Sequence, residues 1–388
     1  MNNARIRRKN CLKIFVTAAI SIFLLPMYAF TLPKTDFVLT IYANDKVYVL
    51  GYPDIIPSFG KLKLNDENAV TDKIFLDNYT PPENARVLFT PGENQTFSFV
   101  PEKYGVAPDK DRLKRDIALA LEERLPVAYV EFVKIKPEFC LSDAHKSVLE
   151  RGRFCTFYGT SSPERKKNIK LAADKINGLV IESGKTFSFN ETVGDRTREN
   201  GYMDAKVIVG GKFTDGIGGG VCQVSTTLYN AALLSDVTVT ERHAHSVAVG
   251  YVSPSFDAAV SFGWYDLKLK NDTGGKLYAE CRADGENLTF IFYGLENEYD
   301  IKRISEVYKK TNPGYETIDD PTGDLCGYAD EKILAMPKYE VSSMGKLLYT
   351  SKNKSNTGGG RKKSFYVSLG SDKYRGVKGV IAKKSLRG

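Results

Sequence analysis

The stretch GIGGGVCQVSTTLYNAAL, residues 216–233, decides the fold around it because it places Cys222 where a glycine-rich loop meets a helix predicted over residues 223–234. Unpaired N–H groups and a partial positive charge at a helix N-terminus favour thiolate over thiol. They can lower a cysteine pKa from about 8.5 to roughly 3.5–7.5. The sequence RHAHS follows at residues 242–246. An imidazole from that segment near Cys222 would complete a nucleophile and base pair.

The glycines before Cys222 allow backbone to pass close to another group. That property suits an exposed sulfur with a substrate carbonyl lying against it, so Gly219 and Gly220 are candidate substrate contacts. Phosphate binding is disfavoured because no Gly-Lys-Ser/Thr follows and the Gly-x-Gly-x-x-Gly spacing is absent. Free cysteine is also often fully buried, and a buried small hydrophobe at Cys222 is an equal alternative from composition alone.

The two histidines of the RHAHS segment, His243 and His245, fall two apart in a β-like stretch, so both are predicted to point to one side. One would serve as general base and the other as part of the site wall. A third group should orient the imidazole. Asp257 and Asp266 lie downstream, and Asp257 is the choice because Asp266 shares its predicted strand face with two lysines, which suggests solvent exposure.

Arg196, Arg242 and Tyr202 are candidates to hold a substrate carboxylate, for which the guanidinium fork is well shaped, although each residue type is more often a surface or packing residue. The His-x-His spacing invites a metal interpretation. The chain has only one other histidine, His145, and no evident carboxylate cluster, so neither a metal nor another cofactor is expected.

These motifs resemble the VanW-like family over about residues 150–294. The matching segments, in chain order, are Gly184–Asn190, Val193–Thr197, Gly201-Tyr202, Gly218–Leu233, Arg242–Ser246, Asp257-Ala258, and Asp266-Leu267 with Asn271. The family occurs on exported bacterial proteins associated with the cell wall, and its name comes from glycopeptide (vancomycin) resistance gene clusters. The resemblance implies a mixed α+β domain with short strands around a cysteine-bearing helix.

Some VanW-like domains are understood to act as L,D-transpeptidases in which a cysteine attacks a peptidoglycan stem peptide. On this chain the resemblance implies Cys222 as the acylated nucleophile and His245 as the general base. An amine acceptor would form a 3-3 cross-link, and water as acceptor would make the protein an L,D-carboxypeptidase. The alternative from another class is a non-catalytic peptidoglycan-binding or envelope protein in which Cys222 is part of the core.

The N-terminal residues 1–30 have the layout of an export signal. Five cations up to Lys13 precede an apolar run from Ile14 to Phe30. A cleaved signal peptide and a retained membrane anchor both remain open, and either predicts an extracytoplasmic location. Because disulfides persist there, a Cys140–Cys155 bridge is a candidate, with all cysteines reduced as the alternative.

The chain length of 388 residues predicts two or three domains. Residues 31–155 are predicted as a small α/β domain, with a strand pattern over Phe37–Leu50, a helix over Asp109–Arg124 and a strand over Val127–Ile135. Its later part loosely resembles a peptidoglycan-binding-like domain. Residues 156–294 form the VanW-like domain, with a helix start at Ser162-Pro163 and a hairpin turn at Asp284-Gly285.

The C-terminal third is predicted as a small β appendage over residues 295–350, including a hairpin that turns through residues 342–345. A basic flexible tail is predicted over residues 351–388, where Asp372 is the single acidic residue among eleven Lys or Arg residues. The tail is expected to be solvated, with contact to an anionic wall polymer or membrane surface as the alternative. No nucleic-acid partner is expected, and the sequence does not determine the oligomeric state.

Overall fold

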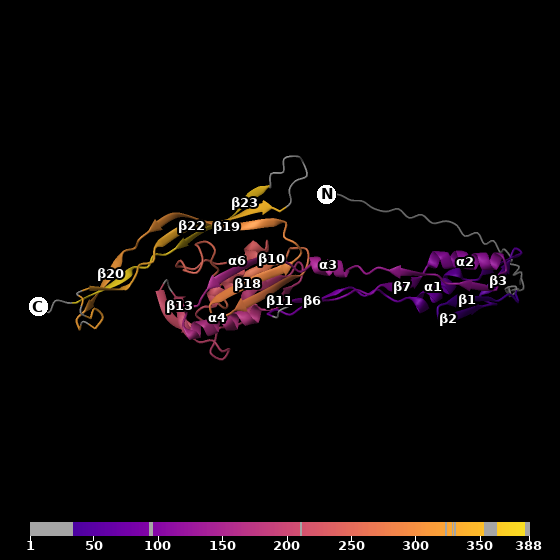
Figure 1. Ribbon diagram of the computed structural model, residues 1–388, viewed down its shortest axis with the longest axis horizontal. Helices are drawn as coiled ribbons and strands as arrows, with labels where there is room; N and C mark the ends of the chain where they lie inside the picture. Colours follow the sequence, from indigo (N-terminus) through magenta and orange to yellow (C-terminus); the bar gives the residue numbers. More distant parts are fainter. Residues whose placement is uncertain are drawn as a thin grey trace, which may run out of the picture. The chain divides into compact units, whose positions relative to one another are not determined.

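The computed structural model describes residues 34–92, 96–209, 212–322, 324–327, 329, 331–352 and 363–384. It is a mixed α+β structure of short helices and several small sheets, as predicted (Figure 1). The predicted leader lies outside the described residues. The chain divides into two compact units, the first from residues up to 80 with 106–134, and the second from residues 81–105 with 135–388. The predicted boundary at residue 155 therefore falls inside the second unit.

The first unit packs helices against small sheets around a core that includes Leu39, Ile41 and Ile117. Its elements are β1 (Leu39–Ala43), β2 (Lys46–Leu50), β3 (Ile55–Ser58), β4 (Lys61–Leu64), α1 (Glu67–Asn78), α2 (Lys110–Glu122) and β8 (Val127–Tyr129). Asp109 caps α2 by accepting from the Arg112 N–H. The helix buries an apolar repeat made of Leu113, Ile117, Ala120 and Leu121. The predicted strand over residues 37–50 is instead the hairpin β1–β2.

Five short elements come between these and the central sheet of the second unit: β5 (Arg86–Phe89), β6 (Phe97–Val100), β7 (Gly105–Pro108), β9 (Phe132–Ile135) and α3 (Leu141–Lys146).

The second unit is centred on an antiparallel sheet with the order β10 (Leu149–Phe157), β18 (Asn287–Gly294), β17 (Leu277–Ala283) and β11 (Leu179–Ile181). Helix α4 (Pro163–Ile176) packs on β17, and α6 (Val221–Leu234) packs on β10 and β18. Ser162 caps α4 with proline at its first position, and the β17–β18 hairpin forms, both as predicted.

Around this sheet lie a small sheet of β12 (Thr186–Ser188), β16 (Lys268–Lys270) and β15 (Thr238–Glu241), the hairpin β13 (Asp204–Val209) with β14 (Lys212–Ile217), and α5 (Phe189–Val193). Helix α6 is buried on nearly every side, which is typical of a core helix. Its polar side chains have partners: Ser225 Oγ donates to the Ala258 carbonyl at 2.7 Å, and Asn230 Nδ2 to the Phe256 carbonyl at 2.6 Å. Helix α6 thereby fixes the chain segment on both sides of Asp257.

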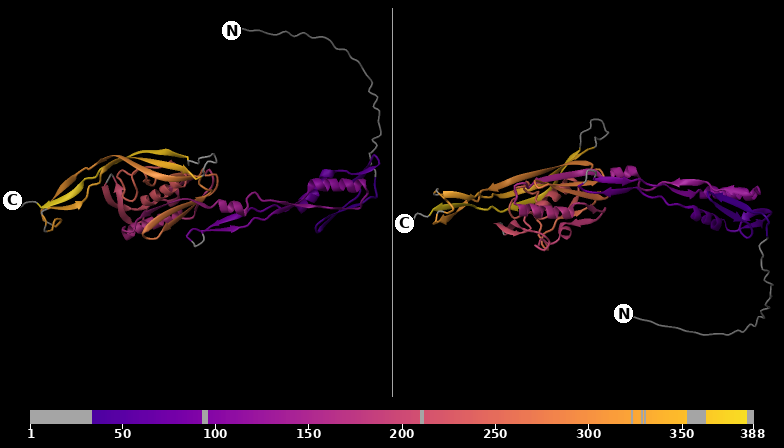
Figure 2. Two further views of the ribbon diagram at one scale, coloured as in Figure 1. Left: turned by 45° about the horizontal axis from the view of Figure 1, so that its top comes forward. Right: turned by 60° about the horizontal axis from the view of Figure 1, so that its bottom comes forward.

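The C-terminal region forms two further sheets, β19 (Tyr299–Thr311) with β22 (Glu340–Ser351) and β23 (Ser364–Tyr374), and β20 (Tyr315–Asp320) with β24 (Gly379–Lys384) and β21 (Glu331–Ala335). Figure 2 shows the long strands β19 and β22 running side by side. The predicted turn at residues 342–345 is wrong because β22 is continuous through it. The flexible tail is also wrong for residues 364–374 and 379–384, because a high charge content does not prevent strand pairing.

All five cysteines that the structure describes carry free thiols, so the predicted Cys140–Cys155 bridge is absent. Cys140 is buried at the start of α3, and Cys155 is exposed on β10. Among the helices in the described part of the chain, none is long and apolar enough to span a membrane.

Candidate functional site

The glycine-rich turn before α6 is fixed by close packing. Gly220 is the N-cap of α6 with a φ of 107°, in the left-handed region that favours glycine. A Cβ on Gly220 would lie 2.9 Å from Ile169 Cγ1 of α4, and a Cβ on Gly219 would lie 2.8 Å from the Lys206 carbonyl oxygen of β13. Packing accounts for both glycines, and their contact with a substrate stays a prediction.

Cys222 is the second residue of α6 and is half-buried, with Sγ 3.5 Å from the Val260 carbonyl oxygen. Its side chain lies close enough to that of His245 for each to shift the pKa of the other. Burial alone would raise the pKa of Cys222, but the interactions with His245 outweigh burial and lower it. Burial would likewise lower the pKa of His245, but hydrogen bonds to Asp257 and Cys222 raise it to about 10. These interactions favour the thiolate form of Cys222 and the imidazolium form of His245.

Asp257, which the sequence predicts as the third group, contacts the imidazole of His245. His245 Nδ1 lies 2.6 Å from Asp257 Oδ2, and the same oxygen accepts the backbone N–H of His245 at 2.7 Å. The carboxylate is 1% exposed. Burial would raise its pKa, but the hydrogen bond and charge of His245, followed by the charge of Arg242, lower it to about 2. Cys222, His245 and Asp257 are thus arranged in the order of a nucleophile, a base and an orienting group.

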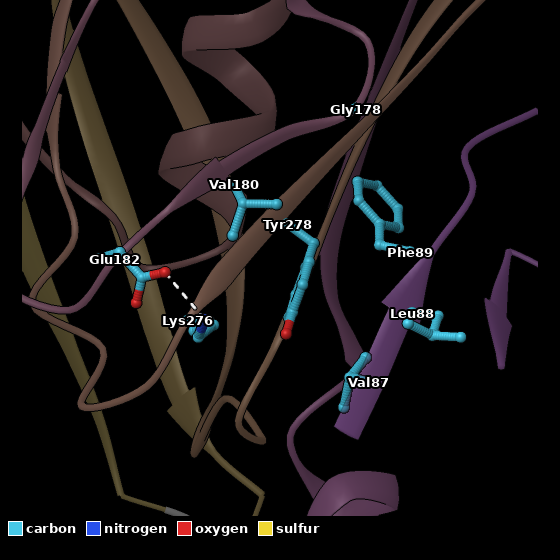
Figure 3. A pocket seen from close by; sticks show the side chains of 8 residues that line it. All are labelled: Val87, Leu88, Phe89, Gly178, Val180, Glu182, Lys276 and Tyr278. Atoms are coloured by element: carbon cyan, nitrogen blue, oxygen red, sulfur yellow. Dashed lines mark ion pairs between the residues drawn. The ribbon is translucent and has the colours of Figure 1, made fainter. Parts of the chain in front are cut away.

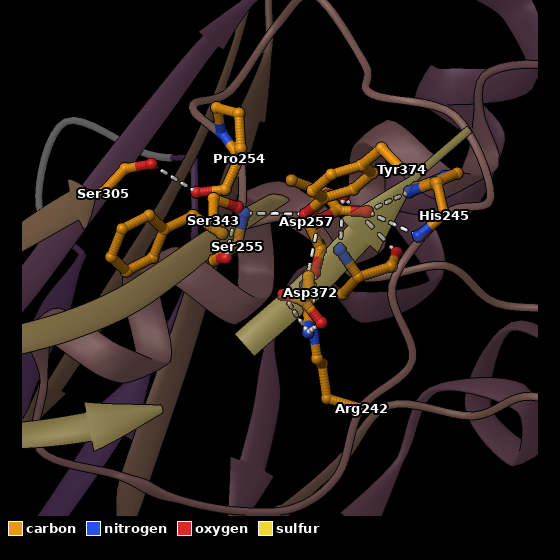
Figure 4. Close-up of polar contacts among 12 residues, drawn as sticks. Arg242, His245, Pro254, Ser255, Asp257, Ser305, Ser343, Asp372 and Tyr374 are labelled. Atoms are coloured by element: carbon orange, nitrogen blue, oxygen red, sulfur yellow. Dashed lines mark hydrogen bonds and ion pairs between the residues drawn. The ribbon is translucent and has the colours of Figure 1, made fainter. Parts of the chain in front are cut away.

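The other carboxylate oxygen of Asp257 is held by two residues (Figure 4). Its Oδ1 accepts from Arg242 Nη2 at 2.9 Å and from the Tyr374 hydroxyl at 2.6 Å. Arg242 also donates Nε to the Asp257 carbonyl at 2.6 Å, and Nη1 to both carboxylate oxygens of Asp372 at 2.8 and 2.9 Å. The guanidinium is therefore bound by protein groups, and the prediction that Arg242 holds a substrate carboxylate does not fit this arrangement.

The structure bears on two further sequence-based predictions. His243 has Nε2 3.2 Å from Glu241 Oε1 and its ring centroid 4.5 Å from that of Tyr265, and its contact with a substrate stays a prediction. Asp266 is buried instead of exposed. It accepts from Ser188 Oγ at 2.5 Å and from the Asn190 N–H at 2.9 Å, which fixes the start of α5.

Arg196 and Tyr202 are the other two residues that the sequence predicts to hold a substrate carboxylate. Arg196 donates to Asn190 Oδ1 at 2.7 Å and to the Gly194 carbonyl at 3.0 Å, and its positive charge favours the Cys222 thiolate. The Tyr202 hydroxyl is buried and has no hydrogen-bond partner among the described residues. A buried hydroxyl without a partner is unusual, so Tyr202 stays a candidate substrate contact.

A separate pocket of about 440 Å³ lies at the edge strand β11 (Figure 3). Its polar lining includes an ion pair of 2.8 Å between Glu182 and Lys276, beside the ring of Tyr278. None of the residues of the Cys222 site lines this pocket. No group of three or more His, Cys, Asp or Glu side chains suited to a metal occurs in the described ranges.

Sequence reasoning missed Asp372 and Tyr374, which lie on β23 and contact Arg242 and Asp257. One signal was present, because Asp372 is the single acidic residue in an otherwise basic segment.

Comparison with known proteins gives two relatives and one family. The family model described as VanW like protein matches residues 164–293. The chain is 32% identical over 195 residues to the vancomycin B-type resistance protein VanW of Enterococcus faecalis, covering 48% of this chain and 68% of that protein. It is 37% identical over 153 residues to the uncharacterized protein YoaR of Bacillus subtilis, covering 39% of this chain and spanning half the length of YoaR. No solved structure matches. With the similarity to VanW extending over two thirds of that protein, the chain belongs to the VanW family.

Proposed function

We propose that this protein is a cysteine-dependent acyltransferase of the bacterial cell envelope that acts on peptidoglycan tetrapeptide stems in the manner of an L,D-transpeptidase. One observation carries the proposal: Cys222 lies close enough to His245 for each to shift the pKa of the other, and His245 Nδ1 lies 2.6 Å from Asp257 Oδ2. Cysteine acyltransferases and proteases use this order of groups. An extracytoplasmic location, proposed from residues 1–30, agrees with such a substrate.

In the first half-reaction the Cys222 thiolate attacks the carbonyl carbon at the L-centre of the stem peptide. The His245 imidazolium gives its proton to the departing nitrogen of the terminal D-alanine, the C–N bond breaks, and a thioester remains on Cys222. In the second half-reaction an amine of a neighbouring stem attacks the thioester and gives a proton to neutral His245. The thiolate leaves and a 3-3 cross-link is formed. Water in place of the amine would release a tripeptide.

The first turn of α6 supplies a candidate donor for the oxyanion formed in each step. The Val221 N–H donates to the Gly218 carbonyl at 3.2 Å, and the Gln223 N–H to the Gly220 carbonyl at 2.9 Å. The N–H of Cys222 has no such acceptor within the described ranges. It therefore stands ready for a substrate oxygen, and one oxyanion donor typically contributes about 3 kcal/mol to transition-state stabilisation.

An exposed aromatic turn beside Cys222 suits a large substrate. The turn 261–265 follows Val260, whose carbonyl contacts the thiol, and it presents Trp264 with 84% of its surface exposed. The turn is held in place because Asn190 Nδ2 donates to the carbonyls of Ser261 at 3.2 Å and Tyr265 at 2.8 Å. Trp264 lies four positions after Val260, a span of at most about 14 Å, so a glycopeptide bound at Cys222 can reach the indole ring.

The second candidate is a non-catalytic wall-binding protein linked to vancomycin resistance. The packing of Cys222 against the main hydrophobic core favours it, as does the name of the Enterococcus faecalis relative. This candidate requires the thiol only as a packing group. It predicts slow reaction with thiol reagents and unchanged wall chemistry in Cys222→Ala.

Product analysis separates these candidates. The full-length protein is incubated with disaccharide-tetrapeptide, and released D-alanine and 3-3 dimers are measured for wild type, Cys222→Ala and the control Cys155→Ala, which removes an exposed thiol on β10. We expect products from wild type and the control, and none from Cys222→Ala. Folded wild-type protein that yields no product would overturn the proposal, and tripeptide without dimer would make the enzyme a carboxypeptidase.

A further inference from the structure

Strand β23 lies outside the segment that matches the family model, yet it contacts the Cys222 site. The Tyr374 hydroxyl is 2.6 Å from Asp257 Oδ1 and accepts the backbone N–H of Ser255 at 2.7 Å. A tyrosine hydroxyl has a single proton. Because the Ser255 N–H points at the oxygen, the Tyr374 proton is directed to the carboxylate.

We propose that Tyr374 and Asp372 are positioning residues for the Cys222–His245–Asp257 site, and that the C-terminal β-region is required for the reactivity of the thiol. Tyr374 fixes the orientation of the Asp257 carboxylate, and Asp372 fixes Arg242. The inference depends on the proposed function only for which reaction Cys222 performs. The effect of Tyr374 and Asp372 on the reactivity of the thiol is measurable without any substrate.

The Asp257 carboxylate has donors on both oxygens. Its Oδ2 accepts two hydrogen bonds from His245, and its Oδ1 accepts one each from Arg242 and Tyr374. Rotation of the carboxylate would break bonds on both sides at once, so its orientation toward His245 Nδ1 is fixed. Removing the Tyr374 hydroxyl leaves Oδ1 with Arg242 alone and leaves the Ser255 N–H without its acceptor.

Asp372 acts through Arg242. Both of its oxygens bind Nη1 of Arg242, and each of these side chains is largely buried. Asp372 therefore balances part of the guanidinium charge. Without it, Arg242 would draw more strongly on Asp257, in competition with His245 for the same carboxylate.

The strand itself is tied to the loops that carry the site. Tyr374 pairs with Val341 of β22, the next residue Arg375 donates its N–H to the Ser246 carbonyl at 2.7 Å, and the hydroxyls of Ser255 and Ser343 lie 2.8 Å apart. Ser246 follows His245, and Ser255 precedes Asp257 by two residues. The C-terminal sheet thus holds the chain next to both members of the His–Asp pair.

The test is the alkylation rate of Cys222 by iodoacetamide as a function of pH, followed by peptide mass spectrometry on the full-length protein. Tyr374→Phe is compared with Tyr366→Phe, which removes a hydroxyl from a 65% exposed ring on the same strand. We expect Tyr374→Phe to move the acid limb of the profile to higher pH, with a fall of about tenfold in rate on that limb, as for loss of one charge-assisted hydrogen bond. Tyr366→Phe should superimpose on wild type.

Asp372→Asn is the second variant, with the exposed Asp319→Asn as its control, and circular dichroism melts establish that each variant is folded. We expect a fall of about threefold, in the same direction, for Asp372→Asn. This variant decides the question if Tyr374→Phe does not fold. Other groups that act on the site are unchanged in every variant, namely Arg165, Arg196, Arg242, Tyr251 and Asp257.

Folded variants whose profiles match wild type, or shift to lower pH, would overturn the inference. The result is independent of wall chemistry. A shifted profile in a protein that makes no peptidoglycan product would refute the proposed function and keep the positioning role. Normal product formation with unshifted profiles would support the proposed function and refute the positioning role.

Discussion

The family-matched segment and the C-terminal sheets contribute to one site in different ways. The first, residues 164–293, carries Cys222, His245 and Asp257, and these residues stand in motifs that a reader can find in the sequence. The second carries Tyr374, which reaches Asp257 across 117 residues of chain, in a region that shows no motif. Reacting groups can thus be located from local sequence, whereas the groups that orient them can come from any strand that the fold brings near.

The largest effect is expected from Asp257→Asn in the family-matched segment. An amide at this position cannot hold the imidazolium or its tautomer, and the equivalent change in a serine triad lowers kcat by about 10⁴-fold. D-alanine release at saturating substrate measures the effect, with Asp195→Asn on the exposed surface as control. Activity within tenfold of wild type would show that Asp257 only supports the fold.

A stability effect is expected at low pH from the same carboxylate. The folded pKa of Asp257 is about 2, below its ordinary value, so its contribution to stability is present above pH 4 and is lost as pH falls toward 2. Burial at 1% exposure makes this a contribution of about 2 kcal/mol. Thermal melts between pH 5 and pH 2 should show a steeper loss for wild type than for Asp257→Asn. Parallel slopes would contradict the assignment.

Substitutions in the glycine turn test whether the stability of the family-matched segment depends on close packing there. Gly219→Ala places a Cβ 2.8 Å from β13 backbone and is expected to cost about 1–3 kcal/mol. Gly250→Ala is the control, because a Cβ there meets no atom within 4 Å. Urea unfolding measures both. Equal free energies of unfolding for the two variants would contradict the packing explanation. Substrate contact would then be the remaining role of the glycine turn.

The smallest effect concerns Trp264, the single tryptophan of the chain. Trp264→Ala is expected to raise KM for a disaccharide-tetrapeptide severalfold and to leave Cys222 alkylation unchanged, because the proposed function places the ring against the substrate and not against the thiol. Leu76→Ala, at a 71% exposed side chain on α1, is the control. Quenching or enhancement of tryptophan fluorescence by the same ligand checks the contact in the wild-type protein. Unchanged fluorescence and KM would remove Trp264 from the site.

Local signals predicted much of the fold. The cap at Ser162 and the apolar repeat of α2 gave correct helices because each depends only on near neighbours in sequence. Helix α1 was missed because only Thr71 and Ile74 of its residues are buried, too few for a visible apolar stripe. The strands after residue 351 were missed because their pairing partners are distant and their lysines suggested a solvated tail.

The candidate site divides in the same way. Spacing brought Cys222, His245 and Asp257 to attention, and the structure places them together. Strand alternation predicted that Asp266 faces solvent. This prediction was wrong because the carboxylate binds the start of α5. Contacts such as Tyr374 to Asp257 depend on tertiary packing, which no local period encodes.

The most direct test of this account is intact-mass analysis of the full-length protein after incubation with disaccharide-tetrapeptide and, separately, with a carbapenem. The account predicts a covalent adduct on wild type that peptide mapping assigns to Cys222, and no adduct on Cys222→Ala. An adduct elsewhere, or none on folded protein that turns over no substrate, would contradict it.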